Sequence, residues 1–425
     1  MSLERALSIF LILAPFCGAP VFARNLLSLP GTKPLLLFAL LLSFIALVNH
    51  RRSIKMARLA FFFAIILITL FTVSIVRSLP HLPQIASSQN MDDTSTSGYL
   101  LSYFIKPLIY FLPFIIIAKF FYQLRQLKVV VGSIAVGLVL LSSFLLCIYI
   151  QNIGQDVNEL SDIYAAILGA HRNNLATVFI VGFPFLIARF LVKKDTSSVL
   201  YLGFAIAGTG VLFSRAAYFT VLFTLAFYLI LSKRTKFLPV LITCGFILAL
   251  LTPSIIKERA LKGLEEEDAN EISAGRVSEI WGPLVDESTD SFEKLLLGSG
   301  RRAVVYSDAA NAGKILEVGH PHDMYLEVIL DSGLVGLAGL MPFYIILLNR
   351  TYRSLKFIND TELKEYQYAI IVSLSGFLIS GLTDRSLFPN DENFYLWAVM
   401  GLAFNTVRWS QDSRSWHPYQ NVVAD

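Results

Sequence analysis

Charged residues are scarce in this chain, and their scarcity excludes most soluble folds. Asp, Glu, Lys and Arg make up 16% of the 425 residues, whereas 55% of the residues are hydrophobic. The mean hydropathy is +0.63, and apolar stretches run along most of the chain. So few charges cannot cover the surface of a soluble globular protein. We therefore expect an all-α, polytopic membrane protein.

Cysteine is rare as well. Cys17, Cys147 and Cys244 each lie inside an apolar run, and their spacing is unlike that of metal ligands. We interpret them as small core hydrophobes and expect neither a disulfide nor a zinc site.

The small positive charge does not indicate nucleic-acid binding. The formal net charge is +4, but the Lys and Arg residues fall at the ends of apolar stretches rather than on one face. We expect membrane lipids around the chain and no nucleic-acid partner.

Twelve apolar segments are long enough to cross a bilayer as helices. They lie near residues 6–23, 34–49, 58–77, 99–121, 129–151, 174–192, 196–213, 216–232, 236–255, 323–348, 367–383 and 393–407. The first segment has the alternative of being a signal peptide cleaved after Ala23. We favour a retained helix, because an even number of spans places both termini on the basic side.

Every second connection between these segments is basic. The basic connections are 51–58, 119–128, 189–194, 233–236 and 350–356. By the positive-inside rule they face the cytoplasm, as does a tail at 409–425. The chain then divides into helices one to nine (1–255), an outer loop (256–322), helices ten to twelve (323–408) and the tail. The outer side also carries 78–98, 152–173, 214–215 and 384–392.

The outer loop is the one sizeable polar element. Its acidic run at 265–268 is typical of solvated surface. Residues 277–281 are expected to form a short helix, with Arg276 and Glu279 near each other at a spacing of three. Trp281 is expected at the membrane interface.

Two histidines close this loop, at His320 and His322. Pro321 favours the first turn of a helix, which would set His322 beside unpaired backbone N–H groups. That position favours the neutral imidazole that a general base needs, although the neighbouring Asp323 favours the cation. A pair of solvated histidines at a helix cap is the alternative.

Several basic residues are predicted on the same outer surface. Arg215 lies at a tight junction between two spans, Arg172 and Asn174 lie at the mouth of the sixth, and Arg276 lies in the loop. Guanidinium groups match phosphate oxygens bidentately, so this set predicts a site for a phosphate or diphosphate carried by a lipid. Each arginine alone has the alternative of being an interfacial side chain that reaches for water. Lys106, near the outer end of the fourth span, either does the same or joins the anion site.

These motifs resemble the O-antigen ligase family, which includes O-antigen polymerases and bacterial O-oligosaccharyltransferases. The hallmark reads His322-Asp323, nine residues ending at Ser332, then Gly333-Leu334-Val335-Gly336. The family more often has Asn, Ser or Gln where this chain has Asp323. Further family features, in the family's order, are Asn173-Asn174, Ser214-Arg215, Gly275 to Trp281, and Gly298-Ser299-Gly300.

The resemblance implies a helical membrane glycosyltransferase of the Gram-negative inner membrane, acting on the periplasmic side where the outer loop lies. The donor would be a glycan on undecaprenyl diphosphate, and the acceptor a sugar hydroxyl of lipid A-core. Neither a cofactor nor a metal is expected. His322 would take the proton of the acceptor hydroxyl, while Arg215 and Arg276 hold the diphosphate. Arg172, Asn174 and His320 would assist in binding donor or acceptor.

Two alternatives stay open. An O-antigen or exopolysaccharide polymerase would use the same donor chemistry with a second lipid-linked glycan as acceptor. A lipid-linked glycan transporter would fit twelve spans, but transporters usually show internal repeats or charges near the membrane midplane.

Overall fold

The computed structural model describes residues 2–20, 34–49, 56–88, 95–239, 275–315, 318–383 and 385–412. Within these ranges the chain forms helices, turns and loops and no strand. The ninth predicted span (236–255) lies almost wholly outside the described residues. So do Cys244, the acidic run at 265–268, Asp384 and most of the predicted tail.

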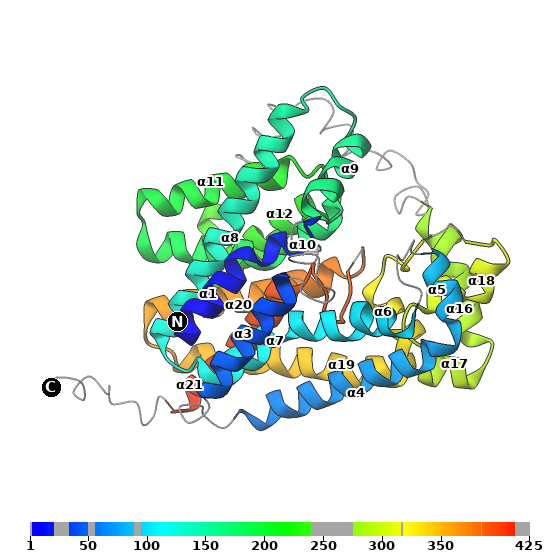
Figure 1. Ribbon diagram of the computed structural model, residues 1–425. Coiled ribbons are helices and arrows are strands. Elements are labelled where there is room, and N and C mark those ends of the chain that lie inside the picture. The colour runs from blue at the N-terminus through cyan, green and yellow to red at the C-terminus, as the bar shows by residue number, and fades with distance from the viewer. Residues whose placement is uncertain are drawn as a thin grey trace.

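The helices follow the predicted segments closely (Figure 1). The first half of the chain contains α1 (Leu3–Leu13), η1 (Ala14–Phe16), α3 (Pro34–Val48), α4 (Arg58–Ser78), η4 (Leu79–His81), α5 (Leu82–Ser88), α6 (Thr96–Leu100), η5 (Leu101–Ile105), α7 (Lys106–Phe120), α8 (Leu124–Gln151), α9 (Val157–Leu168) and α10 (Arg172–Lys193). The second half contains α11 (Thr196–Gly210), α12 (Arg215–Leu231), η6 (Thr235–Phe237), η7 (Val277–Trp281), α16 (Gly282–Thr289), α17 (Phe292–Leu297), η8 (Ala303–Tyr306), α18 (Asp308–Asn311), α19 (Met324–Ser354), η9 (Leu355–Phe357), α20 (Thr361–Ser380) and α21 (Phe394–Asp412).

Five of the described helical segments are long and apolar enough to cross a membrane. They are Arg58–Ser87, Thr96–Phe120, Leu124–Gln151, Arg172–Lys193 and Met324–Phe357. Shorter apolar helices cover Pro34–Val48, Ala217–Leu231 and Phe394–Thr406. The expectation of an all-α, polytopic membrane protein is thus confirmed, and the count of twelve spans stays a prediction.

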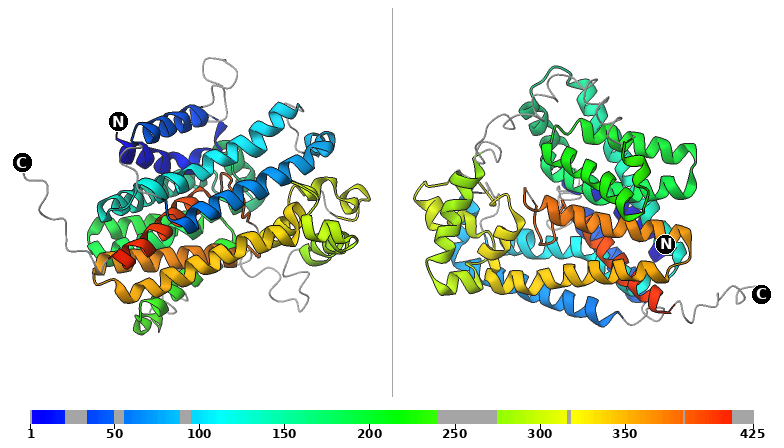
Figure 2. Two further views of the ribbon diagram at one scale, coloured as in Figure 1. Left: turned by 90° about the horizontal axis from the view of Figure 1, so that it is seen from below. Right: turned by 180° about the vertical axis from the view of Figure 1, so that it is seen from behind.

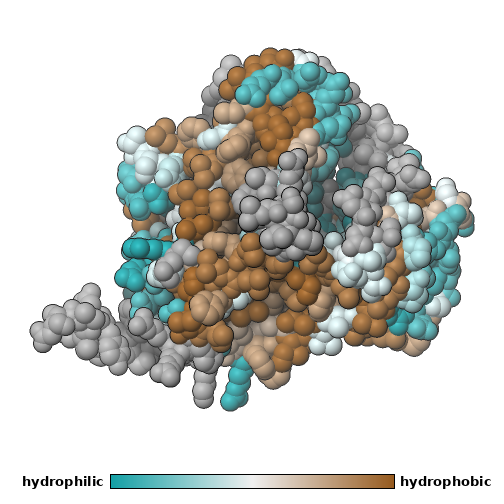
Figure 3. Space-filling model, in the orientation of Figure 1, coloured by the Kyte–Doolittle hydropathy of each residue, from teal (hydrophilic) through white to brown (hydrophobic). Residues whose placement is uncertain are grey.

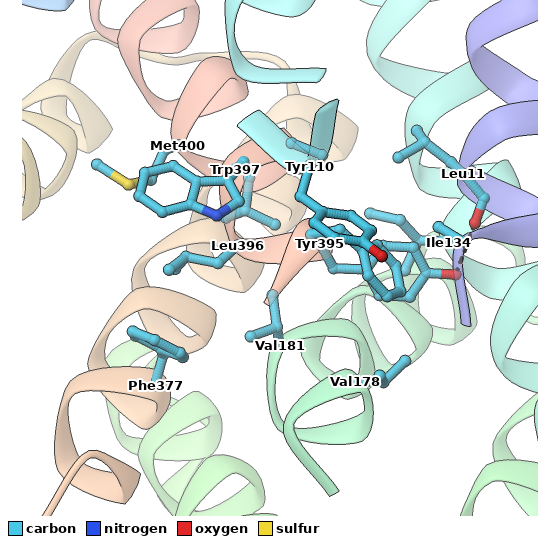
Figure 4. Close-up of a cluster of buried hydrophobic side chains, with 14 of the residues drawn as sticks. Leu11, Tyr110, Ile134, Val178, Val181, Phe377, Tyr395, Leu396, Trp397 and Met400 are labelled. Carbon is cyan, nitrogen blue, oxygen red and sulfur yellow. Dashed lines mark hydrogen bonds between the residues drawn. The ribbon is translucent and has the colours of Figure 1, made fainter. Parts of the chain in front are cut away.

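The core lies where the helices cross in the middle of the bundle. α10 packs along α20, and α21 packs along α7. Aromatic side chains fill this region, and two of them have partners for their polar atoms: the Tyr395 hydroxyl donates to the Leu11 carbonyl at 3.0 Å, and the Trp397 indole donates to Asn393 Oδ1 at 2.9 Å. Figure 4 shows Tyr395 reaching α1 from α21, beside Tyr110. α1 is therefore built into the bundle.

One expectation about the cysteines is wrong. Cys17 is buried, but Cys147 is exposed on α8. Its neighbours Phe144 and Ile150 are exposed too, because this stripe of α8 faces outward from the bundle. Cys147 is therefore a surface residue of an apolar helix and not a core residue.

The two ends of the bundle are polar. Residues predicted on the cytoplasmic side lie at one end, and the outer loop lies at the other. At one end Arg125 pairs with Glu4, Lys128 with Glu362, and Arg234 with Glu365, at N–O distances of 3.2, 2.7 and 2.5 Å. The outer loop lies at the other end, as both views in Figure 2 show for α16, α17 and α18. Figure 3 shows hydrophobic side chains over the middle of the molecule and hydrophilic ones at its left and right ends.

A second, smaller hydrophobic cluster holds the described part of the outer loop against the bundle. Ile280, Leu284 and Val304 of the loop pack with Ile75 of α4 and Leu330 of α19. α16, η8 and α18 therefore form a cap with its own core over the ends of α4 and α19.

Candidate functional site

The segment 298–302 meets α19 at a break in that helix. Gly333 has φ 68° and ψ −172°, which leaves nearby carbonyl groups without their helical partners. The N–H groups of Ser299 and Gly300 donate to the carbonyls of Leu330 and Asp331, at 2.7 and 3.2 Å. The break in α19 thus becomes a backbone docking point for the loop.

Arg301 fastens this docking point with a buried ion pair network. Its Nη1 donates to Glu327 Oε1 at 2.8 Å and to Asp331 Oδ2 at 2.7 Å, and its guanidinium lies 4.8 Å from the Phe388 ring centre. The three ion-paired side chains are no more than 9% exposed. Burial opposes the charge of Arg301, but the two carboxylates raise its pKa above the ordinary value. Arg301 is therefore a charged, fixed anchor.

The segment 319–323, called the histidine loop, leads into a helix N-cap that differs from the one expected. α19 begins at Met324, and Asp323 is its N-cap, with Oδ1 accepting the N–H groups of Tyr325 and Leu326 at 2.8 Å each. Burial raises the pKa of Asp323, and these two hydrogen bonds partly offset the rise. The expectation that Pro321 opens the helix and places His322 on its N–H groups is wrong, because the Asp323 carboxylate occupies that position.

His322 instead lies before the cap, in a left-handed backbone conformation with φ 56°. Its N–H donates to His320 Nδ1 at 3.2 Å, and the two imidazole ring centres are 4.1 Å apart. The two histidines therefore form one unit rather than two separate side chains.

Three contacts hold the histidine loop in place. Trp281 Nε1 donates to the Pro321 carbonyl at 2.7 Å, and Arg302 Nη1 donates to the Gly319 carbonyl at 2.5 Å. The Met324 N–H donates at 2.9 Å to the carbonyl of Gly381, the residue that follows α20. Trp281, expected at the membrane interface, is half-buried against the second cluster and positions this loop.

The predicted basic residues come from loops that meet near the end of α20. Arg276 Nη1 donates to the Thr383 carbonyl. Arg385 Nη1 donates to the Asn173 carbonyl at 2.9 Å, and the Ser214 hydroxyl donates to Asn173 Oδ1 at 3.1 Å. The junction that ends in Arg215 and the start of α10, which carries Asn174, therefore lie beside the turn after α20.

Arg172 differs from the others. It is buried, and its Nη1 donates to the Val157 carbonyl of α9 at 3.2 Å. Its contacts join α9 to α10.

A cavity of about 340 Å³ opens at this end of the bundle. It is lined by Ser102, Tyr103, Lys106, Pro107, Tyr110, Arg301, Arg302, His320, Glu327, Arg385, Ser386, Pro389, Asn390, Asp391 and Glu392. Of the predicted site residues, His320 lines it and so does Lys106, whereas His322, Arg215, Arg276, Arg172 and Asn174 do not. A larger cavity, of about 1080 Å³, lies at the opposite end around Glu4 and Arg125.

The sequence reasoning gave no role to Arg301, Arg302 or Glu327. The pair Arg301-Arg302 directly follows Gly298-Ser299-Gly300, and a carboxylate at 327 inside a predicted membrane helix is costly without a partner. Both signals were present in the sequence. The sequence did not show that Arg301 and Glu327 contact each other.

The comparisons with known proteins concern the part of the chain that builds this end. Residues 197–341 match the family model described as O-antigen ligase. The matched region runs from α11 into α19 and contains Arg276, Arg301, His320 and His322. No curated protein matches the chain.

Proposed function

We propose that this chain, a membrane protein of the O-antigen ligase family, transfers a glycan from undecaprenyl diphosphate to a sugar hydroxyl of lipid A-core. The observation that carries the proposal is the cavity of about 340 Å³ that Lys106, Arg302 and Arg385 line next to the paired histidines. A small polar cavity with several cations suits a diphosphate. Exposed apolar side chains such as Ile105, which precedes the lining residue Lys106 in the chain, suit the prenyl chain.

The reaction is a direct displacement. His322 takes the proton from the acceptor hydroxyl while the hydroxyl oxygen attacks the anomeric carbon of the donor sugar. The bond between that carbon and the diphosphate oxygen breaks, and its electron pair leaves with the diphosphate. His320, which touches both the cavity and His322, places the base at the edge of the donor site.

The basic residues stabilise the charge that develops on the leaving group. Lys106, Arg302 and Arg385 line the cavity, and Arg215 at the start of α12 and Arg276 before η7 complete the diphosphate site from neighbouring segments. Losing one well-placed stabilising group commonly costs about 10²–10³ in rate. Arg301 is different, since its charge is matched by Glu327 and Asp331. Arg172 and Asn174 support the donor or acceptor from the start of α10.

We place the protein in the Gram-negative inner membrane, with this site facing the periplasm. The basic connections gather at the end of the bundle opposite the histidines, which the positive-inside rule assigns to the cytoplasm. Single cysteines at the exposed positions Thr289 and Lys356, in a cysteine-free background, test the orientation. A membrane-impermeant maleimide should label Thr289→Cys in spheroplasts and leave Lys356→Cys unlabelled, and the opposite pattern would invert the topology.

The function is tested with purified protein and a defined undecaprenyl-diphosphate glycan, with and without lipid A-core, by sizing the products. Transfer that requires lipid A-core, survives EDTA and disappears in His322→Ala is expected. His81→Ala is the matched control, because His81 lies at the same end, stacked on Tyr306 and away from the cavity lining. A ladder of longer glycans without lipid A-core would make the protein a polymerase. Absence of any covalent product would leave transport as the better reading.

A further inference from the structure

Glu327 is a buried carboxylate in the cavity wall with only one of its oxygens engaged. Its Oε1 accepts a hydrogen bond from Arg301 Nη1 at 2.8 Å. Its Oε2 is buried and accepts no hydrogen bond from any residue in the described part of the chain. The side chain is 8% exposed and lines the cavity.

Asp331 pairs with the same arginine, but unlike Glu327 it has no carboxylate oxygen left without a donor. The Asp331 Oδ2 accepts from Arg301, and its Oδ1 accepts the Ala303 N–H at 3.3 Å. Asp331 lies one helical turn further along α19, outside the cavity lining. Both of its oxygens are used inside the protein, whereas Oε2 of Glu327, a residue of the cavity lining, is left without a donor among the described residues.

An ionised carboxylate only accepts hydrogen bonds, and a buried acceptor without a donor is unfavourable. A ligand that brings a donor removes that penalty on binding. Arg301 also fixes the direction of the carboxylate, because its guanidinium is held by Asp331 and packs on the Phe388 ring. Glu327 is therefore a preorganised acceptor rather than a mobile surface charge.

The other residues of the cavity identify the donor that Glu327 meets. Lys106, Arg302 and Arg385 attract phosphate, while the carboxylates of the lining, Glu327, Asp391 and Glu392, repel it. A ligand that satisfies both carries a phosphate group next to a hydroxyl-bearing part, within about 340 Å³. The sugar bonded directly to a diphosphate has this form.

We propose that Glu327 accepts a hydrogen bond from a hydroxyl group of the sugar attached to the diphosphate and thereby selects that sugar. The inference rests on the proposed function and adds the residue that recognises the donor's first sugar. A hydrogen bond to a charged group of this kind contributes about 10- to 100-fold in affinity.

The test measures equilibrium binding of radiolabelled farnesyl-diphosphate-N-acetylglucosamine to the purified full chain in nanodiscs. The probes include its 3-, 4- and 6-deoxy analogues and farnesyl diphosphate without a sugar. The variant is Glu327→Gln, which keeps the size of the side chain but replaces an acceptor oxygen with a donor nitrogen. Glu293→Gln is the control, since Glu293 lies at the same end of the bundle and pairs with Arg77 on the surface.

We expect the unmodified protein to bind one deoxy analogue about 10- to 100-fold more weakly than the parent sugar. Glu327→Gln should bind the parent more weakly by a similar factor, lose the discrimination against that analogue, and bind farnesyl diphosphate undiminished. Glu293→Gln should behave like the unmodified protein.

The inference is overturned if the deoxy penalty survives in Glu327→Gln, or if the unmodified protein binds all the probes equally. If the unmodified protein binds neither farnesyl diphosphate nor its sugar derivatives, the proposed function fails as well. A misfolded Glu327→Gln would bind farnesyl diphosphate poorly, which separates loss of structure from loss of recognition. In that event Asp331→Asn, which alters the same network outside the cavity, decides: the proposal then requires that it retain the deoxy penalty.

Discussion

Gly333 of α19 and Leu296 of α17 lie so close together that a Cβ atom on Gly333 would overlap the Leu296 carbonyl group. Gly333 also has a left-handed φ of 68°. Two independent constraints, backbone conformation and space, therefore require glycine at this point of the sequence motif. The same residue creates the break at which Ser299 and Gly300 dock.

Gly333→Ala should destabilise the protein and reduce its transfer activity. The left-handed backbone costs about 1–3 kcal/mol for a non-glycine residue, and the overlap with Leu296 adds to that. Gly203→Ala is the control, because no atom outside the adjacent backbone of its own helix lies within 4 Å of the position a Cβ would take, and alanine favours the helix. Thermal unfolding in detergent should show a lower midpoint for Gly333→Ala alone. Equal midpoints would mean that α17 moves away without loss.

Two ion pairs lie at the end of the bundle opposite the histidines, and we expect similar substitutions in them to have different effects on stability. Glu365 is 5% exposed and pairs with Arg234, whereas Arg125 is 76% exposed in its pair with Glu4. Arg234→Met leaves a buried carboxylate without its cation and should cost about 3–5 kcal/mol. Arg125→Met should cost about 0–1 kcal/mol, because water screens that pair. Denaturant unfolding of both variants measures the difference. A similar loss in both would show that burial does not govern these pairs.

The raised pKa of Asp323 predicts that the stability of the protein depends on pH. Burial raises the pKa of this carboxyl, so between its ordinary value and the raised value the folded chain holds more protons than the unfolded chain. Its contribution to stability therefore falls as pH rises through that window. Asp323→Asn should flatten the stability curve there while keeping the helix cap, since the amide oxygen also accepts from Tyr325 and Leu326.

Asp323→Ala removes the cap itself. The lost cap should cost about 0.5–2 kcal/mol, and the substitution also removes the titrating carboxyl. Unfolding midpoints measured from mildly acidic to neutral pH compare the two variants. Parallel curves for Asp323→Asn and the unmodified protein would contradict the assigned titration.

Trp281→Phe should lower the transfer rate a few-fold and leave the stability nearly unchanged. The phenyl ring keeps the packing against the second cluster, but the indole N–H that holds the Pro321 carbonyl is lost. A hydrogen bond of this kind contributes about 1 kcal/mol, which corresponds to a few-fold change in rate when it positions the histidines. Steady-state kinetics should show the loss in kcat. A loss confined to KM would place Trp281 in binding instead.

The sequence predicted the positions of the helices because each long apolar run has one physical solution in a membrane. It also predicted which connections share an end of the bundle, as the pairing of Lys128 with Glu362 illustrates. Local signals were harder to rank. Pro321 predicted the helix start, and the structure shows that the Asp323 carboxylate supplies the cap two residues later.

Contacts between distant segments could not be predicted. A single glycine such as Gly333 in an apolar run is compatible with a straight helix, so its left-handed conformation leaves no local pattern. The network of Arg301 with Glu327 and Asp331 joins a loop to a helix. A single sequence gives no means to pair such residues, and the lining of the cavity follows from that pairing.

The cap of α16, η8 and α18 is fastened to the bundle by main-chain hydrogen bonds, by Arg301 and by the inward-facing side chains of the second hydrophobic cluster. Main-chain hydrogen bonds are indifferent to the side chains around them. The outward-facing residues of the cap, such as Val285 and Asp286, can therefore be exchanged without disturbing the histidines. Under the proposed function, this arrangement would let the same site accept glycans of different shape through changes confined to the surface that surrounds it.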